Sequence, residues 1–458
     1  MATTLVPELL WQDGRFERDR AVVLDGDRIA KVVAAREAVG QTVQLPRRAL
    51  LPGFINAHSH AFQRLIRGRT QWRPAADPSA DFWSWREAMY RAALTLSPDA
   101  IEAVSAFCFL EMLKAGYTTV GEFHYLHNDP SGAPYADPAE LAYRVISAAR
   151  HVGIRIVLLH VAYATGAIDE PLRPEQRRFA TPSLDGYLET VARLRATTVD
   201  QPLVSVGTAP HSIRAVPRAW LADVHAWADL NDVPFHMHVS EQPAEVDAAL
   251  GAYGLRPVEL LEQEGVLDSR LTAVHATHLV AHEVAALGNA AVTVCACPST
   301  ERDLGDGFLQ GAALLDAGAT LAIGTDSQSV IDAFEEVRLL EYHERLRALR
   351  RIVLLPRAAE GDADPGALLL DVATRGGAHA LRVDAGVIAT GAFADLAAVD
   401  LDHIALVGHD ATTLAAHLTL AGRAECVSDV WVGGVRRIQN GVHEAESAVR
   451  STWLTTTT

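Results

Sequence analysis

The chain has 458 residues, 49% of them hydrophobic and 21% charged, with a formal net charge of -17. That length and composition are typical of a globular protein with a large core, and the acidic balance argues against nucleic acid or an anionic membrane as a partner. The four cysteines form no CxxC pair, which favours a reducing cytoplasm over a disulfide framework. We also expect neither a signal peptide nor a membrane span, because no basic segment precedes a long apolar run.

Both ends of the chain have the pattern of short strands separated by Gly-containing turns. Strands are predicted within residues 8–16, 20–33, 391–401 and 425–441. A hairpin is expected at Gly433 and Gly434. We therefore predict that residues 1–50 and 380–458 pack together as one small composite domain, a β-sandwich. Residues 451–458, which end in four threonines, are predicted to be a frayed tail.

Between these ends, β-rich runs alternate with longer helix-patterned segments, as in repeated βα units of a parallel sheet. Eight candidate strands fall at residues 49–60, 118–125, 154–164, 204–212, 234–241, 271–279, 291–298 and 320–327. Helical patterns lie between them, for example at residues 98–115, 138–152, 217–231 and 332–350. This alternation predicts an α/β fold, a (β/α)₈ TIM-type barrel over residues 51–379. The alternative is an open doubly wound sheet, but no GxGxxG fingerprint supports it.

Titratable residues recur where these predicted strands end. Residues two apart in a strand point to the same side, so the two histidines of an HxH pair can face one metal ion. Each motif alone has a plain structural explanation, a hydrogen-bonded histidine or a helix-capping aspartate. Their recurrence at the same end of four strands favours a site, because barrel enzymes build active sites there. The residues concerned are His58, His60, His238, Glu241, His275 and Asp326.

Four segments resemble, in their order and spacing, the metal-site motifs of the amidohydrolase superfamily. They are PGFINAHSHAFQ, HMHVSE, VHATH and IGTDS. The resemblance is to the subgroup that holds one divalent metal, usually zinc. It implies one Zn²⁺ per subunit, although imidazole and carboxylate ligands also accept other divalent metals. Superfamily members with two metals use a carboxylated lysine after the fourth strand, where this chain has Thr-Ala-Pro-His at residues 208–211. The implied ligands are His58, His60, His238 and Asp326.

The same resemblance implies roles for three residues. A divalent ion held by three neutral imidazoles and one carboxylate stays net positive and lowers the pKa of a water toward about 7. Asp326 is then expected to accept a proton from that water. Glu241 is expected to shuttle protons to the substrate nitrogen. His275 is expected to polarise the reacting centre or to stabilise the tetrahedral intermediate.

Longer segments narrow the resemblance. These segments are QRLIRGRTQWRP, DFWSWREAMY, GEFHYLHND and TAPHSIRAVP, and they resemble the N-formimino-L-glutamate deiminase family. The resemblance extends over roughly residues 5 to 450. This implies a cytoplasmic homodimer of histidine degradation that hydrolyses the formimino group to N-formyl-L-glutamate and ammonia. The small substrate is acidic, so an acidic protein needs a local cationic cradle, for which the planar fork of arginine is suited. The implied substrate-binding residues are Gln63, Arg86, Tyr125, His211, Arg214 and Ser329.

Other functions stay open from the sequence. One is a preference for formimino-aspartate or an N-guanidino acid, because one methylene changes selectivity only modestly in many pockets. Another mononuclear deaminase of the superfamily would act on guanine, cytosine or a related neutral ring and would favour a stacking pocket over arginines. A scaffold that had lost the chemistry would lack a ligand or the proton shuttle, and the chain has both. Two of the implied substrate-binding residues also have structural explanations. Arg86 could stack on a neighbouring tryptophan instead of binding substrate, and Ser329 could cap the helix that begins near Asp332.

Overall fold

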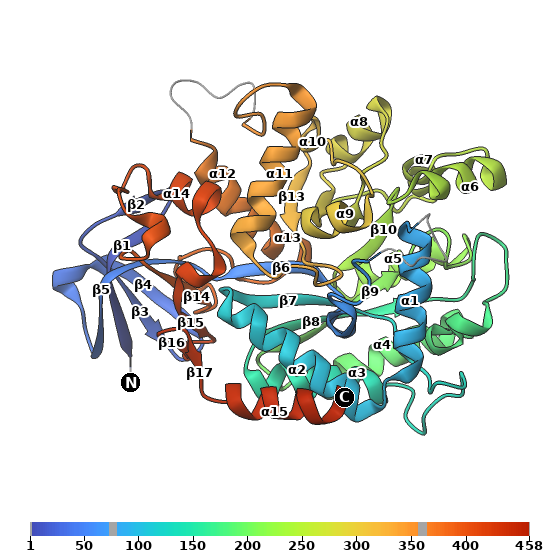
Figure 1. Ribbon diagram of the computed structural model, residues 1–458, viewed down its shortest axis with the longest axis horizontal. Helices are drawn as coiled ribbons and strands as arrows, with labels where there is room; N and C mark the ends of the chain where they lie inside the picture. Colours follow the sequence, from blue (N-terminus) through green and yellow to red (C-terminus); the bar gives the residue numbers. More distant parts are fainter. Residues whose placement is uncertain (1, 73–79, 356–363, 458) are drawn as a thin grey trace.

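The computed structural model describes residues 2–72, 80–355 and 364–457. Eight parallel strands form one sheet in chain order and curve into a barrel (Figure 1). This confirms the predicted (β/α)₈ barrel. The strands are β6 (Phe54–Ser59), β7 (Tyr117–His124), β8 (Arg155–Ala162), β9 (Val204–Pro210), β10 (Phe235–Val239), β11 (Leu271–His275), β12 (Thr293–Ala296) and β13 (Thr320–Ile323).

Helices surround the barrel, and side-chain caps explain where several begin. Ser97, Ser183 and Asp332 each accept a backbone N–H of the first helical turn, as expected for N-cap residues. The helices are α1 (Phe82–Thr95), α2 (Pro98–Lys114), α3 (Glu140–Val152), α4 (Leu184–Thr198), α5 (Trp220–Leu230), α6 (Pro243–Tyr253), α7 (Pro257–Gln263), α8 (Ala281–Asn289), α9 (Pro298–Leu304), α10 (Gly311–Ala317), α11 (Ala333–Ala348), α12 (Pro365–Asp371), α13 (Gly377–Leu381), α14 (Leu414–Ala421) and α15 (Glu446–Thr457). Two 3₁₀ segments, η2 (Ala61–Ile66) and η3 (Pro174–Phe179), lie near the barrel mouth.

The two ends of the chain form one mixed sheet beside the barrel, which confirms that they pack together. Its nine strands include the N-terminal β5, which pairs with the C-terminal β14 (Figure 1). We propose residues 1–50 and 380–458 as the bounds of this composite domain. The strands are β1 (Thr3–Gln12), β2 (Arg15–Glu17), β3 (Arg20–Asp25), β4 (Arg28–Ala34), β5 (Gln41–Pro52), β14 (Leu396–Asp400), β15 (Val427–Val432), β16 (Val435–Gln439) and β17 (Val442–His443).

The predicted frayed tail is wrong for its described residues, because α15 continues to Thr457. The helix packs on α2, where the rings of Trp453 and Phe107 lie 4.8 Å apart. Lys114 also lies 2.7 Å from the carboxylate of Glu446. A threonine-rich end thus stays helical because its apolar face is covered.

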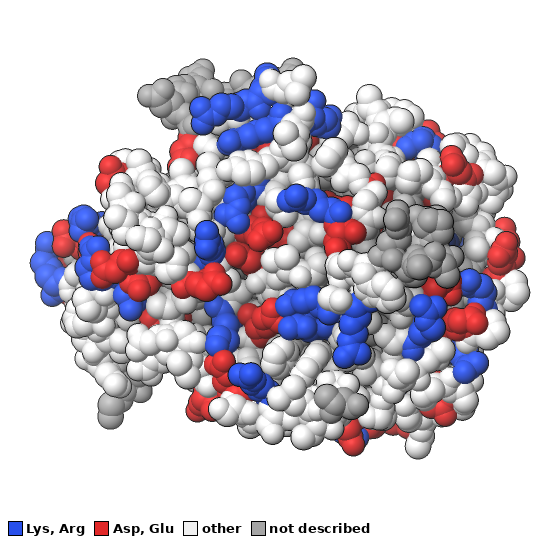
Figure 2. Space-filling view, viewed as in Figure 1, with Lys and Arg blue, Asp and Glu red and all other residues white. Residues whose placement is uncertain are grey.

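The face in Figure 2 has cationic and anionic side chains interspersed over it. Many charged side chains of the described residues form ion pairs, for example Arg64 with Glu111 at 2.8 Å. No helix in the described part of the chain is long and apolar enough to cross a membrane.

A buried ion pair joins the barrel to the terminal sheet. Arg155, at the start of β8, lies 2.7 Å from Asp395, and the two side chains are 5% and 1% exposed. Asp395 also accepts the backbone N–H of Gly433. The guanidinium of Arg155 stacks on the ring of Phe393, 3.5 Å from its centre. Removing one partner would leave the other charged group buried and unpaired.

We predict that Asp395→Ala lowers the free energy of unfolding by about 3 to 5 kcal/mol, the usual effect of breaking a buried pair. Thermal unfolding followed by circular dichroism measures this as a lower Tm. The control is Asp402→Ala, because Asp402 pairs with Arg47 at the surface with 61% and 48% of the side chains exposed, where ion pairs contribute little. Equal shifts in Tm for the two variants would contradict the prediction.

Candidate metal centre and substrate cavity

Four of the predicted residues converge at one end of the barrel. The ligand-type atoms of His58, His60, His238 and Asp326 all lie within 4.8 Å of one another, and all four side chains are buried; we call them the metal group. Nε2 of His58 lies 3.1 Å from Nε2 of His60. Oδ1 of Asp326 lies 3.4 and 3.2 Å from these two nitrogens. Three imidazoles and a carboxylate with this convergence are a donor set typical of zinc.

The backbone brings these residues together. His58 and His60 alternate with Ser59 at the end of β6, and Asp326 follows β13. The amide of His60 donates to the carbonyl of Asp326 at 3.0 Å, and the amide of Asp326 donates to the carbonyl of His58 at 3.0 Å. These two bonds join the last barrel strand to the first. Asp326 has a φ of 41°, a left-handed conformation that the surrounding structure must hold in place.

Hydrogen bonds fix how two of the imidazoles face. Nδ1 of His60 donates to the carbonyl of Phe123 at 3.0 Å, and Nδ1 of His238 donates to the carbonyl of His211 at 2.9 Å. In the neutral ring this leaves Nε2 without a proton and directed at the metal group. Burial lowers the pKa of His58 to about 3 and that of His238 well below its ordinary value. Neutral rings with bare nitrogens around one carboxylate are the form that binds a divalent ion, so the residues present fit a metal.

Gln328 supports the metal group and was missed by the sequence analysis. Its Nε2 donates to Oγ of Ser59 at 3.0 Å and to the carbonyl of Asp326 at 2.8 Å. Its Oε1 accepts the hydroxyl of Thr325 at 2.8 Å. Gln328 therefore connects the end of β6, beside His58 and His60, with Asp326 after β13. The only sequence signal is its place two residues after Asp326.

Glu122, on β7, was also missed. It accepts the hydroxyl of Ser59 at 2.6 Å and the amide of Ala61 at 2.8 Å, so it holds both neighbours of His60. Burial raises the pKa of Glu122 to about 7. The sequence places its segment, GEFHY, in a predicted strand and in the family resemblance, but gives no signal for a role of Glu122 itself.

The two other predicted catalytic residues lie beside the metal group. Nε2 of His275, at the end of β11, lies 3.7 Å from Oε1 of Glu241 and 3.8 Å from Oδ2 of Asp326. His275 is fully buried, and its Nδ1 lies 3.4 Å from Glu301 on α9. Burial acts to lower the pKa of His275, but the neighbouring carboxylates raise it well above its ordinary value. The sequence analysis had not identified Glu301.

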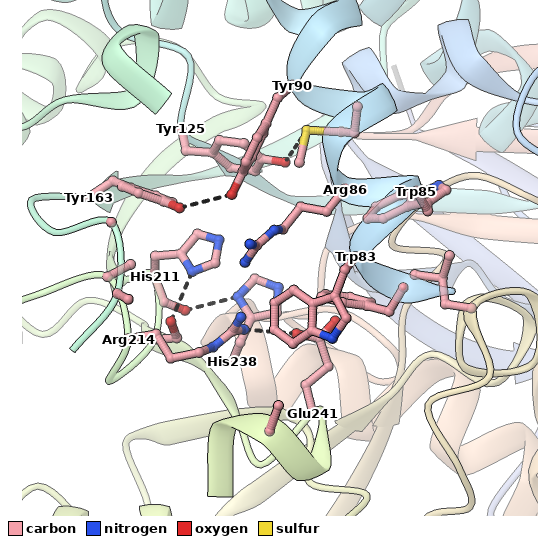
Figure 3. Close-up of a pocket in the computed structure, with 18 of the residues that line it drawn as sticks. Trp83, Trp85, Arg86, Tyr90, Tyr125, Tyr163, His211, Arg214, His238 and Glu241 are labelled. Atoms are coloured by element: carbon pink, nitrogen blue, oxygen red, sulfur yellow. Dashed lines mark hydrogen bonds and ion pairs between the residues drawn. The ribbon is translucent and has the colours of Figure 1, made fainter. Parts of the chain in front are cut away.

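A cavity of about 190 Å³ opens over this group, between α1 and the loops after β8 and β9. His60, His238 and Asp326 line it together with two arginines from different parts of the chain. Figure 3 shows Arg86 pointing from α1 into the cavity toward His211 and His238. Five of the six predicted substrate-binding residues line this space, namely Gln63, Arg86, Tyr125, His211 and Arg214.

Ser329 is the sixth, and it lies half-buried outside the described lining of the cavity. It does not cap α11, because Asp332 accepts the amides of Phe334 and Glu335.

The cavity walls hold several of these groups in fixed positions. The guanidinium of Arg86 stacks on the ring of Trp83, 4.4 Å from its centre. Arg86 therefore both stacks on a neighbouring tryptophan and lines the cavity. Nε2 of Gln63 donates to the hydroxyl of Tyr125 at 2.8 Å. Tyr90 and Tyr163, whose hydroxyls lie 3.3 Å apart, also line the cavity and were not identified from the sequence.

Comparison with known proteins agrees with this geometry. The model of the amidohydrolase family matches residues 49–437. A protein of Pseudomonas aeruginosa named formimidoylglutamate deiminase is 41% identical over 401 residues, which are 87% of this chain and 86% of that protein. The crystal structure of an amidohydrolase from Brucella melitensis has a TM-score of 0.92 at 32% identity and covers 99% of both chains.

A second solved structure holds a metal. It is an adenosine deaminase from Xanthomonas campestris with bound zinc, at 26% identity and a TM-score of 0.82, over 99% of this chain and 97% of that one. The family match spans most of the present chain, including every residue of the metal group. The chain belongs to the amidohydrolase family.

Proposed function

We propose that this chain is a metal-dependent deiminase that hydrolyses N-formimino-L-glutamate to N-formyl-L-glutamate and ammonia. The observation that supports it most is one cavity lined by three of the four metal-group residues and by two arginines. A divalent ion suits hydrolysis of a C–N bond, and a pair of guanidinium groups suits a substrate with two carboxylates. The 41% identical relative named formimidoylglutamate deiminase supports the same substrate.

The metal group is proposed to hold one Zn²⁺ per subunit. When bound, the ion supplies Lewis-acid chemistry and lowers the pKa of a water toward about 7, which makes a nucleophile available at neutral pH. The bound zinc of the Xanthomonas neighbour supports this metal. On the resemblance, we also propose a homodimer with a small acidic substrate. The cysteine pattern is the basis for proposing a cytoplasmic location.

The chain's own residues are then proposed to move the protons. Water adds to the formimino carbon, so a C–O bond forms while Asp326 accepts a proton. Glu241 carries the water's other proton to the formimino nitrogen. The proton held by Asp326 reaches the same nitrogen as the C–N bond breaks, so ammonia leaves and a formyl group remains. His275, 3.7 Å from Glu241 and 3.8 Å from Asp326, stabilises charge on the tetrahedral carbon's oxygen.

The two arginines are proposed to bind the two carboxylates of the substrate. Arg86 is held by its stacking on Trp83, so little side-chain freedom is lost when it binds. Arg214 lies on the other side of the cavity, beside Glu241. Four further contacts are proposed on the resemblance, from Gln63, Tyr125, His211 and Ser329.

We predict that Gln328→Ala weakens retention of Zn²⁺ about 10- to 100-fold, because residues that orient metal ligands have effects of this size. Competition with a coloured chelator measures the affinity without any assay of activity. Gln310→Ala is the control, since the side chain of Gln310 donates to the carbonyl of Leu279 at 2.8 Å, away from the metal group. Equal affinity in wild type and Gln328→Ala would contradict the supporting role.

The substrate is tested by ammonia release from zinc-loaded protein. We expect release from N-formimino-L-glutamate, little from the formimino-aspartate analogue and none from guanine. Chelation and Asp326→Ala should each abolish it, and zinc should restore only the chelated wild type. Release from guanine would overturn the substrate while leaving the metal chemistry, and no release from any of the three would overturn the function.

The arginine pair gives a second prediction for the same assay. Arg86→Met should raise KM about 10- to 100-fold, since hydrogen bonds to charged groups contribute about 1.5–3 kcal/mol. Arg173→Met is the matched control, because Arg173 also stacks on Tyr90 but pairs with Glu87 outside the lining of the cavity. An unchanged KM for Arg86→Met would remove Arg86 from the substrate site.

A further inference from the structure

A second buried carboxylate lies behind Glu241. Glu245, in the first turn of α6, is fully buried. Its Oε2 accepts the backbone N–H of Glu241 at 3.2 Å and lies 3.5 Å from Nε of Arg214. We call Arg214, Glu241 and Glu245 the charge triad. Neither the resemblance nor the comparisons assign a role to Glu245.

In the charge triad one guanidinium is shared between two carboxylates. Nη2 of Arg214 donates to Oε2 of Glu241 at 3.0 Å (Figure 3), whereas its Nε forms only the longer ion pair with Glu245. Among the described residues, neither Nε of Arg214 nor Oε1 of Glu245 has a hydrogen-bond partner. Arg214 is thus bound more closely to Glu241, while Glu245 keeps unused capacity to accept hydrogen bonds.

This arrangement conflicts with the motion that the proposed reaction requires. Glu241 must carry a proton from water to the leaving nitrogen, so its side chain cannot stay bound to Arg214 throughout. An arginine held by Glu241 alone would follow that side chain and would displace the substrate carboxylate bound to it. Misplacement of a substrate by about 1 Å can slow a reaction about 100-fold.

We propose that Glu245 is a positioning residue that holds Arg214 by charge and Glu241 by its backbone. Arg214 then stays in place for the substrate carboxylate while the Glu241 side chain is free to transfer protons. The inference rests on the proposed function, because it needs a substrate carboxylate at Arg214. It makes Glu245 a determinant of both binding and turnover, although it contacts neither substrate nor metal.

The chain offers a close control. Glu283 has the equivalent place in the first turn of α8, the helix that follows the next barrel strand, and it is also fully buried. It accepts the backbone N–H of Val280 at 3.0 Å and pairs with Arg256 at 2.7 Å. It lies outside the described lining of the cavity. Glu283→Gln therefore imposes the same loss of buried charge on the fold without touching the charge triad.

The test compares Glu245→Gln with Glu283→Gln in zinc-loaded protein of equal metal content. We expect Glu245→Gln to raise KM for N-formimino-L-glutamate and to lower kcat, with kcat/KM falling about 10- to 100-fold. Glu283→Gln should lower the Tm without such a change in either constant. Should Glu245→Gln not fold, Glu245→Asp keeps the charge on a shorter side chain and should still raise KM.

A double-mutant cycle separates positioning from a general loss of structure. In an Arg214→Met background, Glu245→Gln should reduce kcat/KM by less than about 3-fold, because its partner is already absent. The same large loss in both backgrounds would overturn the inference, as would unchanged constants in the single variant. Wild-type protein that releases no ammonia from N-formimino-L-glutamate would instead overturn the proposed function, and the inference with it.

Discussion

The closure of the barrel between β6 and β13 is the constraint on which the site depends. Two reciprocal backbone hydrogen bonds between the chain around His58 and Asp326 both complete the sheet and bring metal-group residues from opposite ends of the barrel sequence together. The strands approach so closely that a Cβ on Gly324 would lie 2.7 Å from the carbonyl oxygen of His58, so only glycine fits there. The left-handed Asp326 is then held by Gln328 and by the pairing itself. The backbone bonds that close the barrel therefore also set the positions of metal-group residues.

Charge is arranged differently inside the molecule and on its surface. An acidic chain of net charge -17 places two guanidinium groups, Arg86 and Arg214, in one cavity next to neutral imidazoles. In a partly enclosed cavity, such fixed groups act more strongly on a bound anion than they would in bulk water and need not reorganise when it arrives. The low dielectric also makes the partners of each arginine important. Arg86 is held by aromatic stacking, whereas Arg214 is held by two carboxylates, which is why Glu245 bears on function.

Much of the architecture could be predicted from sequence because its signals are local. Alternating βα patterns gave the barrel, and the two-residue spacing in His58-Ser59-His60 put both rings on one face. The terminal helix could not be predicted, because its stability comes from the contact of Trp453 with α2 rather than from its threonines. Gln328, Glu122 and Glu245 were missed for a related reason. Their roles come from contacts with residues distant in the sequence, Ser59 for Gln328 and Glu122 and Arg214 for Glu245. Ser329 stays a proposal that rests on the resemblance alone, because it lies outside the described lining of the cavity.

Zinc-edge anomalous diffraction from crystals containing N-formyl-L-glutamate, the proposed product, would test the central claim most directly. The account predicts a single metal peak bonded to His58, His60, His238 and Asp326, with the carboxylates of the product on Arg86 and Arg214. A peak elsewhere, for example between His275 and Cys297, or a product whose carboxylates contact neither arginine, would contradict it.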